Sequence, residues 1–163
     1  MPYRDSVEGP VTWVGVTSES EMLLLPGGLE MAGVGDLRPM GAVRAFVEAF
    51  NSADVELAEA ACADETLIID DFPPYEWSGG CSVTRWFHDM ARMAKKYRMS
   101  EPSVALDDPR HVIVAEEHAY VAVPINVRWL EDGTPAERTG SMTMAIRAGA
   151  EGWRISALAW TWN

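Results

Sequence analysis

The sequence contains few of the residues from which metal sites and disulfide frameworks are built. It has two cysteines, Cys62 and Cys81, and three histidines, His88, His111 and His118. Two cysteines do not make a disulfide framework or a metal-binding pattern, and the histidines show neither the HxH nor the HExxH spacing of metal ligands. We therefore expect no metal, and we expect both cysteines to be reduced thiols in a cytoplasmic protein.

Motifs for common cofactors and nucleophiles are also missing. There is no GxSxG nucleophile elbow, no Walker loop and no glycine-rich dinucleotide fingerprint. The sequence therefore predicts no cofactor, and any chemistry has to come from ordinary side chains.

Positive charge is scarce. The chain has 13 Lys and Arg residues against 25 Asp and Glu residues, a formal net charge of -12. Nucleic-acid binding needs a clustered basic surface, and the one dense basic stretch, at positions 92–98, is expected to be a solvated helix face. Long hydrophobic runs are missing too, because Leu23–Leu25 is far too short to span a bilayer. The acidic residues before that run do not fit a secretory signal, so we expect neither a nucleic-acid nor a membrane partner.

What the chain does contain is enough apolar material for one folded domain. It has 163 residues, of which 48% are hydrophobic and 23% are charged, as in ordinary globular proteins. Residues 1–37 carry scattered Gly, Pro and acidic residues without sustained periodicity, so we expect a loosely ordered N-terminal arm. An alternative is that the natural start is Met22, Met31 or Met40. Residues 38–163 are expected to form the folded domain.

Helical periodicity comes first along this domain. Apolar residues recur at i, i+3, i+4 and i+7 from Val43 to Phe50, which predicts a helix that begins near Pro39. Asp54 is a good N-cap for a second helix that ends near Ala63. A short strand is predicted over 66–70, and a strongly amphipathic third helix over 80–97.

Strands follow the helices. β-branched residues alternate along the longest predicted strand, and Asp132-Gly133 suits a type I′ hairpin turn to the next strand. The predicted strands cover residues 104–106, 112–114, 119–130, 138–147 and 153–162. Hairpins join the long strands into an antiparallel meander, and helices followed by strands indicate an α+β fold.

Two adjacent carboxylates, Asp70 and Asp71, stand at the end of the first short strand, before a rigid Pro73-Pro74 corner. Consecutive strand residues point to opposite faces, so only one of the two can face inward. An aspartate inside an apolar cavity has a raised pKa, which makes it a better general base near neutral pH. The alternative is that both carboxylates are turn residues that hold the proline corner.

A cavity is expected because a twisted sheet curls around a helix that packs on one of its faces. If the curl is strong, the helix and the sheet separate at the wider end of the curled sheet and leave a cavity there. The chain has seven tryptophans, whose rings suit apolar walls. Trp77, Trp86 and Trp160 are the expected walls, and Tyr75 is a candidate hydrogen-bond donor. The alternative is that these rings fill the core.

Three segments carry a family resemblance: the helix end from Val43 to Asp54, the segment from Asp70 to Gly80, and the strand Gly152–Ser156. Together they resemble the nuclear transport factor 2-like superfamily, which includes ketosteroid isomerase and the SnoaL-like polyketide cyclases. The resemblance covers residues 38–163. It implies a cone-shaped, curved antiparallel sheet wrapped around N-terminal helices, a cystatin-like α+β barrel. It also implies a homodimer with a pocket for a small apolar molecule at the open end of the cone.

By position, the resemblance puts the general base of ketosteroid isomerase on Asp70 and an aromatic pocket wall on Trp86. It puts the two oxyanion donors of that enzyme on Phe46 and Met144, neither of which can donate a hydrogen bond. Loss of one such donor costs about 10² to 10³ in rate. The resemblance therefore implies a different branch of the superfamily rather than a steroid isomerase.

More than one function is open at this point. In the first, Asp70 abstracts a proton from a small hydrophobic substrate, as in isomerisation, cyclisation or dehydration. In the second, the protein is a non-catalytic ligand-binding or dimerising scaffold. In the third, it is an accessory protein that binds a partner through the outer face of its sheet, which would require an exposed apolar patch there.

Overall fold

The computed structural model describes residues 38–163. The predicted N-terminal arm and the alternative starts at Met22 and Met31 lie outside the described residues, whereas Met40 lies inside the first helix.

Three helices form one layer of the domain. They are α1 (Arg38–Ser52), α2 (Val55–Ala61) and α3 (Ser82–Lys96). α1 buries its predicted apolar stripe, and α3 buries Val83, Trp86 and Phe87. The Asp54 carboxylate caps α2 by accepting a hydrogen bond from the backbone N–H of Leu57 at 3.0 Å. The three predicted helices are confirmed, and their ends differ from the predicted ones by about two residues.

Seven strands form one sheet. They are β1 (Cys62–Ile69), β2 (Glu76–Trp77), β3 (Met99–Leu106), β4 (His111–Ala115), β5 (His118–Glu131), β6 (Thr134–Gly149) and β7 (Gly152–Trp162). The order of neighbours is β2-β1-β7-β6-β5-β3, and β4 also pairs with β5. The sheet is curved but does not close on itself, because β2 and β3 stand at its two ends.

The long strands form the predicted antiparallel meander. Asp132 and Gly133 have φ angles of 52° and 78° between β5 and β6, as a type I′ turn requires. Two features of the sheet were not predicted. β2 pairs with β1, and β1 lies parallel to β7, with Ile68 opposite Leu158. The sheet is therefore mixed rather than purely antiparallel.

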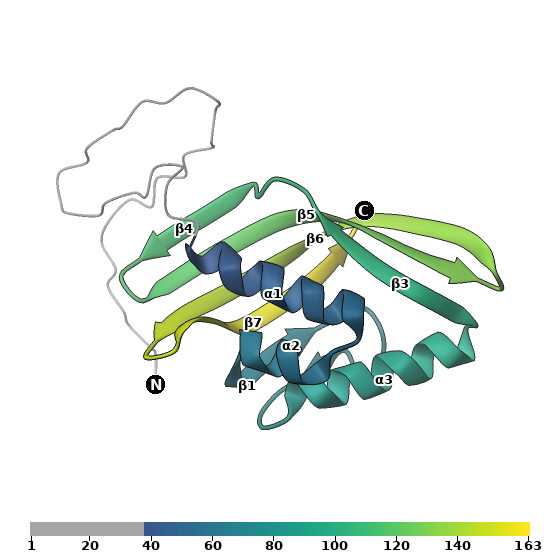
Figure 1. Cartoon of the computed structure of the whole chain (residues 1–163), viewed down its shortest axis with the longest axis horizontal. Coiled ribbons are helices and arrows are strands. Elements are labelled where there is room, and N and C mark those ends of the chain that lie inside the picture. The colour runs from purple at the N-terminus through teal and green to yellow at the C-terminus, as the bar shows by residue number, and fades with distance from the viewer. Residues whose placement is uncertain (1–37) are drawn as a thin grey trace, which may run out of the picture.

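Figure 1 shows α1 lying over β5, β6 and β7, with α2 and α3 beside it. Alternate residues of the long strands face these helices and are buried, among them Val121, Val123 and Ile125 of β5. The hydrophobic core lies between the two layers. Within residues 38–163, no helix combines the length and the apolar composition needed to cross a bilayer.

Gly140 of β6 lies opposite Trp162 of β7. A Cβ atom at position 140 would come within 2.3 Å of the Thr161 carbonyl oxygen and 2.9 Å of Cε3 in the Trp162 ring. Both distances are shorter than real Cβ contacts. Glycine therefore allows β7 and the Trp162 ring to lie against β6.

Gly140→Ala is expected to lower the free energy of unfolding by about 1–3 kcal/mol, because the added methyl group overpacks the contact between β6 and β7. Gly41→Ala in α1 is the matched control. A Cβ at position 41 meets nothing within 4 Å, and alanine is favoured over glycine in helices by about 1 kcal/mol. Urea unfolding measures both variants. A Gly140→Ala protein as stable as the wild type would contradict the close approach of the two strands.

Candidate functional site

Asp70 follows β1 directly and is the only buried carboxylate among residues 38–163, with an exposed fraction of 9%. The chain then forms a tight loop. The Asp70 N–H donates to the Tyr75 carbonyl at 3.2 Å, and the Tyr75 N–H donates to the Phe72 carbonyl at 2.8 Å. The Pro73–Pro74 peptide bond in this loop is cis. The loop holds Asp70 at the point where β1 ends beside α3.

Two hydrogen bonds hold the Asp70 carboxylate. Its Oδ2 accepts from the indole Nε1–H of Trp86 at 2.9 Å, and its Oδ1 accepts from the backbone N–H of Asp71 at 2.8 Å. Burial raises the pKa of the Asp70 carboxyl to about 6, although both hydrogen bonds favour the charged form. A carboxyl with such a pKa is ionised at neutral pH and still accepts a proton readily.

Asp71 lies on the other side of the chain. Its carboxylate forms an ion pair with Arg138 of β6 at 3.2 Å, and both side chains are about half exposed. Exposed ion pairs contribute little to stability. Of the two adjacent carboxylates, Asp70 thus faces the core and Asp71 faces solvent, as strand alternation requires of neighbouring residues.

Trp86 belongs to a row of stacked rings. Phe46 of α1 stacks on Trp86 with ring centroids 5.9 Å apart, and Trp160 of β7 stacks on Trp86 at 6.1 Å. Trp162 continues the row, 6.1 Å from Trp160. The Arg138 guanidinium lies over the Trp162 ring, 4.7 Å from its centroid. We call Trp86, Trp160 and Trp162 the tryptophan row.

Sequence reasoning missed Trp162 and Arg138. The available signal for Trp162 was its spacing, because residues two apart on a strand point to the same face, and Trp162 stands two positions after Trp160 on β7. Arg138 gave no such signal, since it meets Asp71 across 67 positions of the chain.

The remaining predicted site residues lie apart from Asp70 or deeper in the core. Trp77 is buried, packs on Phe72 with centroids 5.0 Å apart, and donates its indole N–H to Asp89 at 2.8 Å. Met144 is buried on β6, whereas Tyr75 is 58% exposed. The structure thus brings Asp70, Phe46, Trp86 and Trp160 together but places the Tyr75 ring outside this group.

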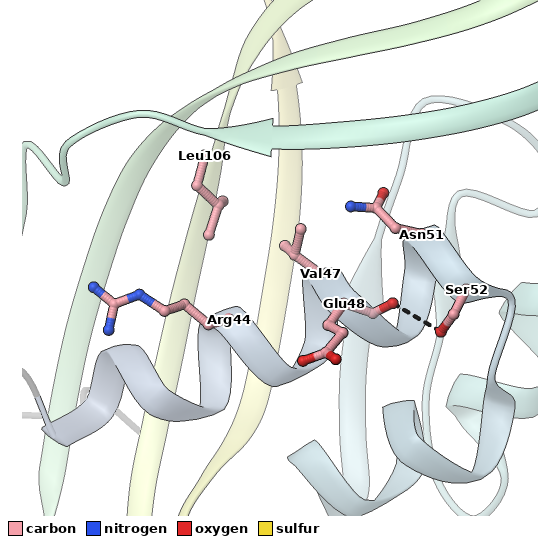
Figure 2. Close-up of a pocket in the computed structure, with 6 residues that line it drawn as sticks. All are labelled: Arg44, Val47, Glu48, Asn51, Ser52 and Leu106. Atoms are coloured by element: carbon pink, nitrogen blue, oxygen red, sulfur yellow. Dashed lines mark hydrogen bonds between the residues drawn. The ribbon is translucent and has the colours of Figure 1, made fainter.

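Two grooves lie on the described surface. The first, of about 480 Å³, separates α1 from β3 and is lined by Arg44, Val47, Glu48, Asn51, Ser52 and Leu106. Figure 2 shows Leu106 pointing from β3 towards α1. Asn51 links the two elements, because its side-chain amide forms hydrogen bonds of 2.9 and 2.7 Å with the backbone of Val104.

The second groove, of about 440 Å³, lies near the hairpin between β5 and β6 and includes Trp129. None of the predicted site residues lines either groove. Around Asp70, the aromatic rings are packed against one another in the core. The predicted hollow beside Asp70 stays a prediction.

Metal-ligating side chains are dispersed in the described part of the chain, where no three His, Cys, Asp or Glu residues gather into a cluster. Cys81 is exposed, and Cys62 is buried. Burial raises the pKa of the Cys62 thiol to about 12, so this thiol stays protonated and is a poor nucleophile.

A family model described as a SnoaL-like domain matches residues 40–158, which is most of the chain. The chain belongs to the SnoaL-like domain family. The family resemblance predicted from the sequence is therefore confirmed. No curated protein matches this SnoaL-like chain.

Solved structures support the same fold for this SnoaL-like protein. A nuclear transport factor 2-like superfamily protein from Salmonella enterica has a TM-score of 0.64 and 14% identity, over 80% of this chain and 93% of that one. A ketosteroid isomerase-like protein from Erwinia carotovora atroseptica has a TM-score of 0.62 and 14% identity, over 78% and 97%. A protein of unknown function from Mycobacterium tuberculosis has a TM-score of 0.66 and 13% identity, over 80% and 72%. At such identities the likeness establishes the fold and leaves activity to be argued from the site.

The raised pKa of Asp70 predicts a pH-dependent stability. Because folding raises this pKa from 3.8 to about 6, the protonated carboxyl contributes stability that is complete below about pH 3.8 and is lost as the pH rises through 6. This difference between the two pKa values corresponds to about 3 kcal/mol of folding free energy. Asparagine cannot ionise, so the stability of Asp70→Asn relative to the wild type should rise by about that amount between pH 4 and pH 7.

Urea unfolding at several pH values measures this trend for both proteins. Asp71→Asn is the matched control, because its exposed ion pair with Arg138 is worth at most about 1 kcal/mol. A stability difference between Asp70→Asn and wild type that does not change with pH would show that the Asp70 carboxyl is not desolvated.

Proposed function

We propose that this SnoaL-like protein binds a small hydrophobic molecule and catalyses a proton transfer in which Asp70 is the base. The reaction class is isomerisation, cyclisation or dehydration of a carbonyl compound. The observation that carries the proposal is the buried Asp70 carboxylate, which meets an aromatic row in a part of the domain otherwise filled by apolar side chains.

The chemistry follows from the surroundings of this carboxylate. In its ionised form, Asp70 would take a proton from the carbon next to a carbonyl group. The electron pair of the broken C–H bond would move to the carbonyl oxygen and form an enolate, and Asp70 would return the proton to the same or another carbon. Base and carbonyl suffice for this step, so the proposal involves no cofactor. Apolar surroundings favour the step because burial keeps the pKa of Asp70 high.

The relatives support a small-molecule site without specifying the reaction. The fold is shared with a ketosteroid isomerase-like protein, and the family is SnoaL-like. Phe46 and Met144 have no hydrogen-bonding hydrogen to offer an enolate, so steroid isomerisation with donors at those positions is not part of the proposal.

The test is exchange of carbon-bound hydrogen. β-Tetralone, a bicyclic ketone with acidic hydrogens next to its carbonyl, is incubated with the protein in deuterium oxide and followed by NMR. We expect the wild type to accelerate deuterium incorporation, with a rate that rises as Asp70 ionises around pH 6 and then levels off. Asp70→Asn should lose about 10²-fold or more of that rate, because a positioned base contributes 10² to 10⁴.

Asp71→Asn controls for charge, since it removes the neighbouring carboxylate but leaves Asp70 in the core. Its exchange rate should stay close to that of the wild type. If the wild type accelerates deuterium incorporation and Asp70→Asn accelerates it equally, Asp70 is excluded as the base.

A second candidate function, a dimerising scaffold, is favoured by the outer face of the sheet. Ile69, Ile113 and Tyr120 are between 38% and 45% exposed. Two cross-strand rows connect them through small side chains: Ile113, Tyr120, Ala145, Ala157 and Leu67 in one, and His111, Ala122, Thr143, Ala159 and Ile69 in the other. These rows contain no Asp, Glu, Lys or Arg. We propose that a second copy of the chain covers this face, because a large uncharged surface of this kind is typical of an interface.

Ala145→Arg tests the proposed dimer. Ala145 is exposed and lies between Tyr120 and Ala157 on the outer face, so a buried arginine there would disrupt an interface between two copies. We expect the wild type to sediment as a dimer and Ala145→Arg to sediment as a monomer. Ala91→Arg on the exposed side of α3 should leave the dimer intact. A monomeric wild type would contradict the proposal.

A further inference from the structure

Two neighbouring indole N–H groups of the tryptophan row lack a hydrogen-bond partner among the described residues. They are Nε1 of Trp160 and Nε1 of Trp162, and both atoms are buried. Trp86, the third member of the row, donates to Asp70, and Trp77 donates to Asp89. Nε1 of Trp129 is also unpaired, but this residue lies in the groove near the β5–β6 hairpin and outside the row.

Unpaired buried donors are unusual. In native proteins about nine in ten buried polar groups have a partner, and leaving one without a partner costs about 1–3 kcal/mol. Trp160 is only 7% exposed, so bulk water does not substitute for the missing acceptor. An indole nitrogen donates and cannot accept. The group that Trp160 lacks is therefore a hydrogen-bond acceptor.

The surroundings of Trp160 define the chemistry of that acceptor. Its ring stacks on Trp86, which holds the Asp70 carboxylate, and also on Trp162. The Arg138 guanidinium lies over Trp162 at the end of the row. Flat aromatic surface favours a planar, conjugated molecule, and the unpaired N–H groups favour an oxygen acceptor, most of all one on which negative charge develops.

We infer that Trp160 is the oxyanion donor of the site, and that the ligand is a planar, conjugated carbonyl compound or phenol whose oxygen accepts the Trp160 Nε1–H. The inference rests on the proposed proton transfer and deepens it. It supplies from β7 the donor that Phe46 and Met144 cannot supply from α1 and β6. Trp162 contributes a wall and a second unpaired N–H at the end of the row.

Binding requires the row to open, because its rings are in contact. Trp162 is the member that can move most easily. It is the last residue of β7, it is less deeply buried than Trp86 and Trp160, and one face of its ring is covered by the half-exposed Arg138 side chain. Outward displacement of Trp162 and Arg138 would loosen the row, so that a planar ligand could reach the edge of the Trp160 ring that carries Nε1 while the bond between Trp86 and Asp70 stays in place.

The experiment uses β-naphthol as the probe, because its phenolic oxygen resembles an enolate oxygen on a planar ring system. The full chain is labelled with nitrogen-15 at tryptophan, and each indole resonance is assigned by single Trp→Phe variants. On titration with β-naphthol we expect the Trp160 indole proton to shift downfield as it gains an acceptor. The Trp77 indole, already bonded to Asp89, should stay in place. Naphthalene has the same rings without the oxygen and should produce no downfield shift at Trp160.

Trp160→Phe keeps an aromatic ring but removes the N–H. It should weaken β-naphthol binding about tenfold while leaving naphthalene binding nearly unchanged, because the hydrogen bond to the phenolic oxygen is lost. Trp153→Phe, at the start of β7 and outside the row, is the matched control and should bind like the wild type. If Trp160→Phe does not fold, the wild-type titration alone decides the outcome.

Two results would overturn the inference: β-naphthol that does not bind the wild type, or β-naphthol that binds without moving the Trp160 indole resonance. The proposed function fails on a different observation, hydrogen exchange that does not depend on Asp70. A protein that shows the Trp160 shift but no Asp70-dependent exchange would be a ligand-binding module that uses this donor.

Discussion

The hydrogen bond from Trp86 to Asp70 is the contact on which the interior of this domain depends. It joins α3 to the end of β1, and it fixes the plane of the Trp86 ring. Phe46 from α1 and Trp160 from β7 both stack on that ring. Four elements that are distant in sequence thus meet at one indole. Loss of either partner would leave a buried polar group unpaired at their common point.

This bond also explains why a carboxylate is tolerated in an apolar interior. Asp70 receives two N–H groups, one from Trp86 and one from the backbone of Asp71, and an ionised carboxylate can accept both. Even so, its pKa rises to about 6, because desolvation by burial outweighs the two hydrogen bonds. The structure therefore stabilises the orientation of the carboxylate more than it stabilises its charge. A carboxylate held in this way is structurally fixed and chemically still a base.

Much of the fold could be predicted from the sequence, because its signals are local. The stripe from Val43 to Phe50 and the Asp132-Gly133 turn each act over a few residues, and both are confirmed. The parallel pairing of β1 with β7 could not be predicted, since no turn joins these strands and nothing nearby fixes their direction. For the site, alternation predicted one inward carboxylate but not which one. Whether rings line a hollow or fill a core depends on how side chains from separate elements interlock, and Trp86 with Trp160 shows that they stack in contact.

The indole N–H groups of the tryptophan row can stabilise negative charge on the groups to which they donate hydrogen bonds. Before a proton transfer of the proposed kind, the charge is on Asp70, where the Trp86 N–H stabilises it. After the transfer, the charge is on the oxygen of the ligand, and the nearest unpaired donor in the row belongs to Trp160, whose ring centroid is 6.1 Å from that of Trp86. Two stacked indoles of the same row would then serve the two ends of one charge movement. Gly140 has a part in this arrangement as well, because its missing side chain leaves the room in which the Trp162 ring lies against the sheet and completes the row.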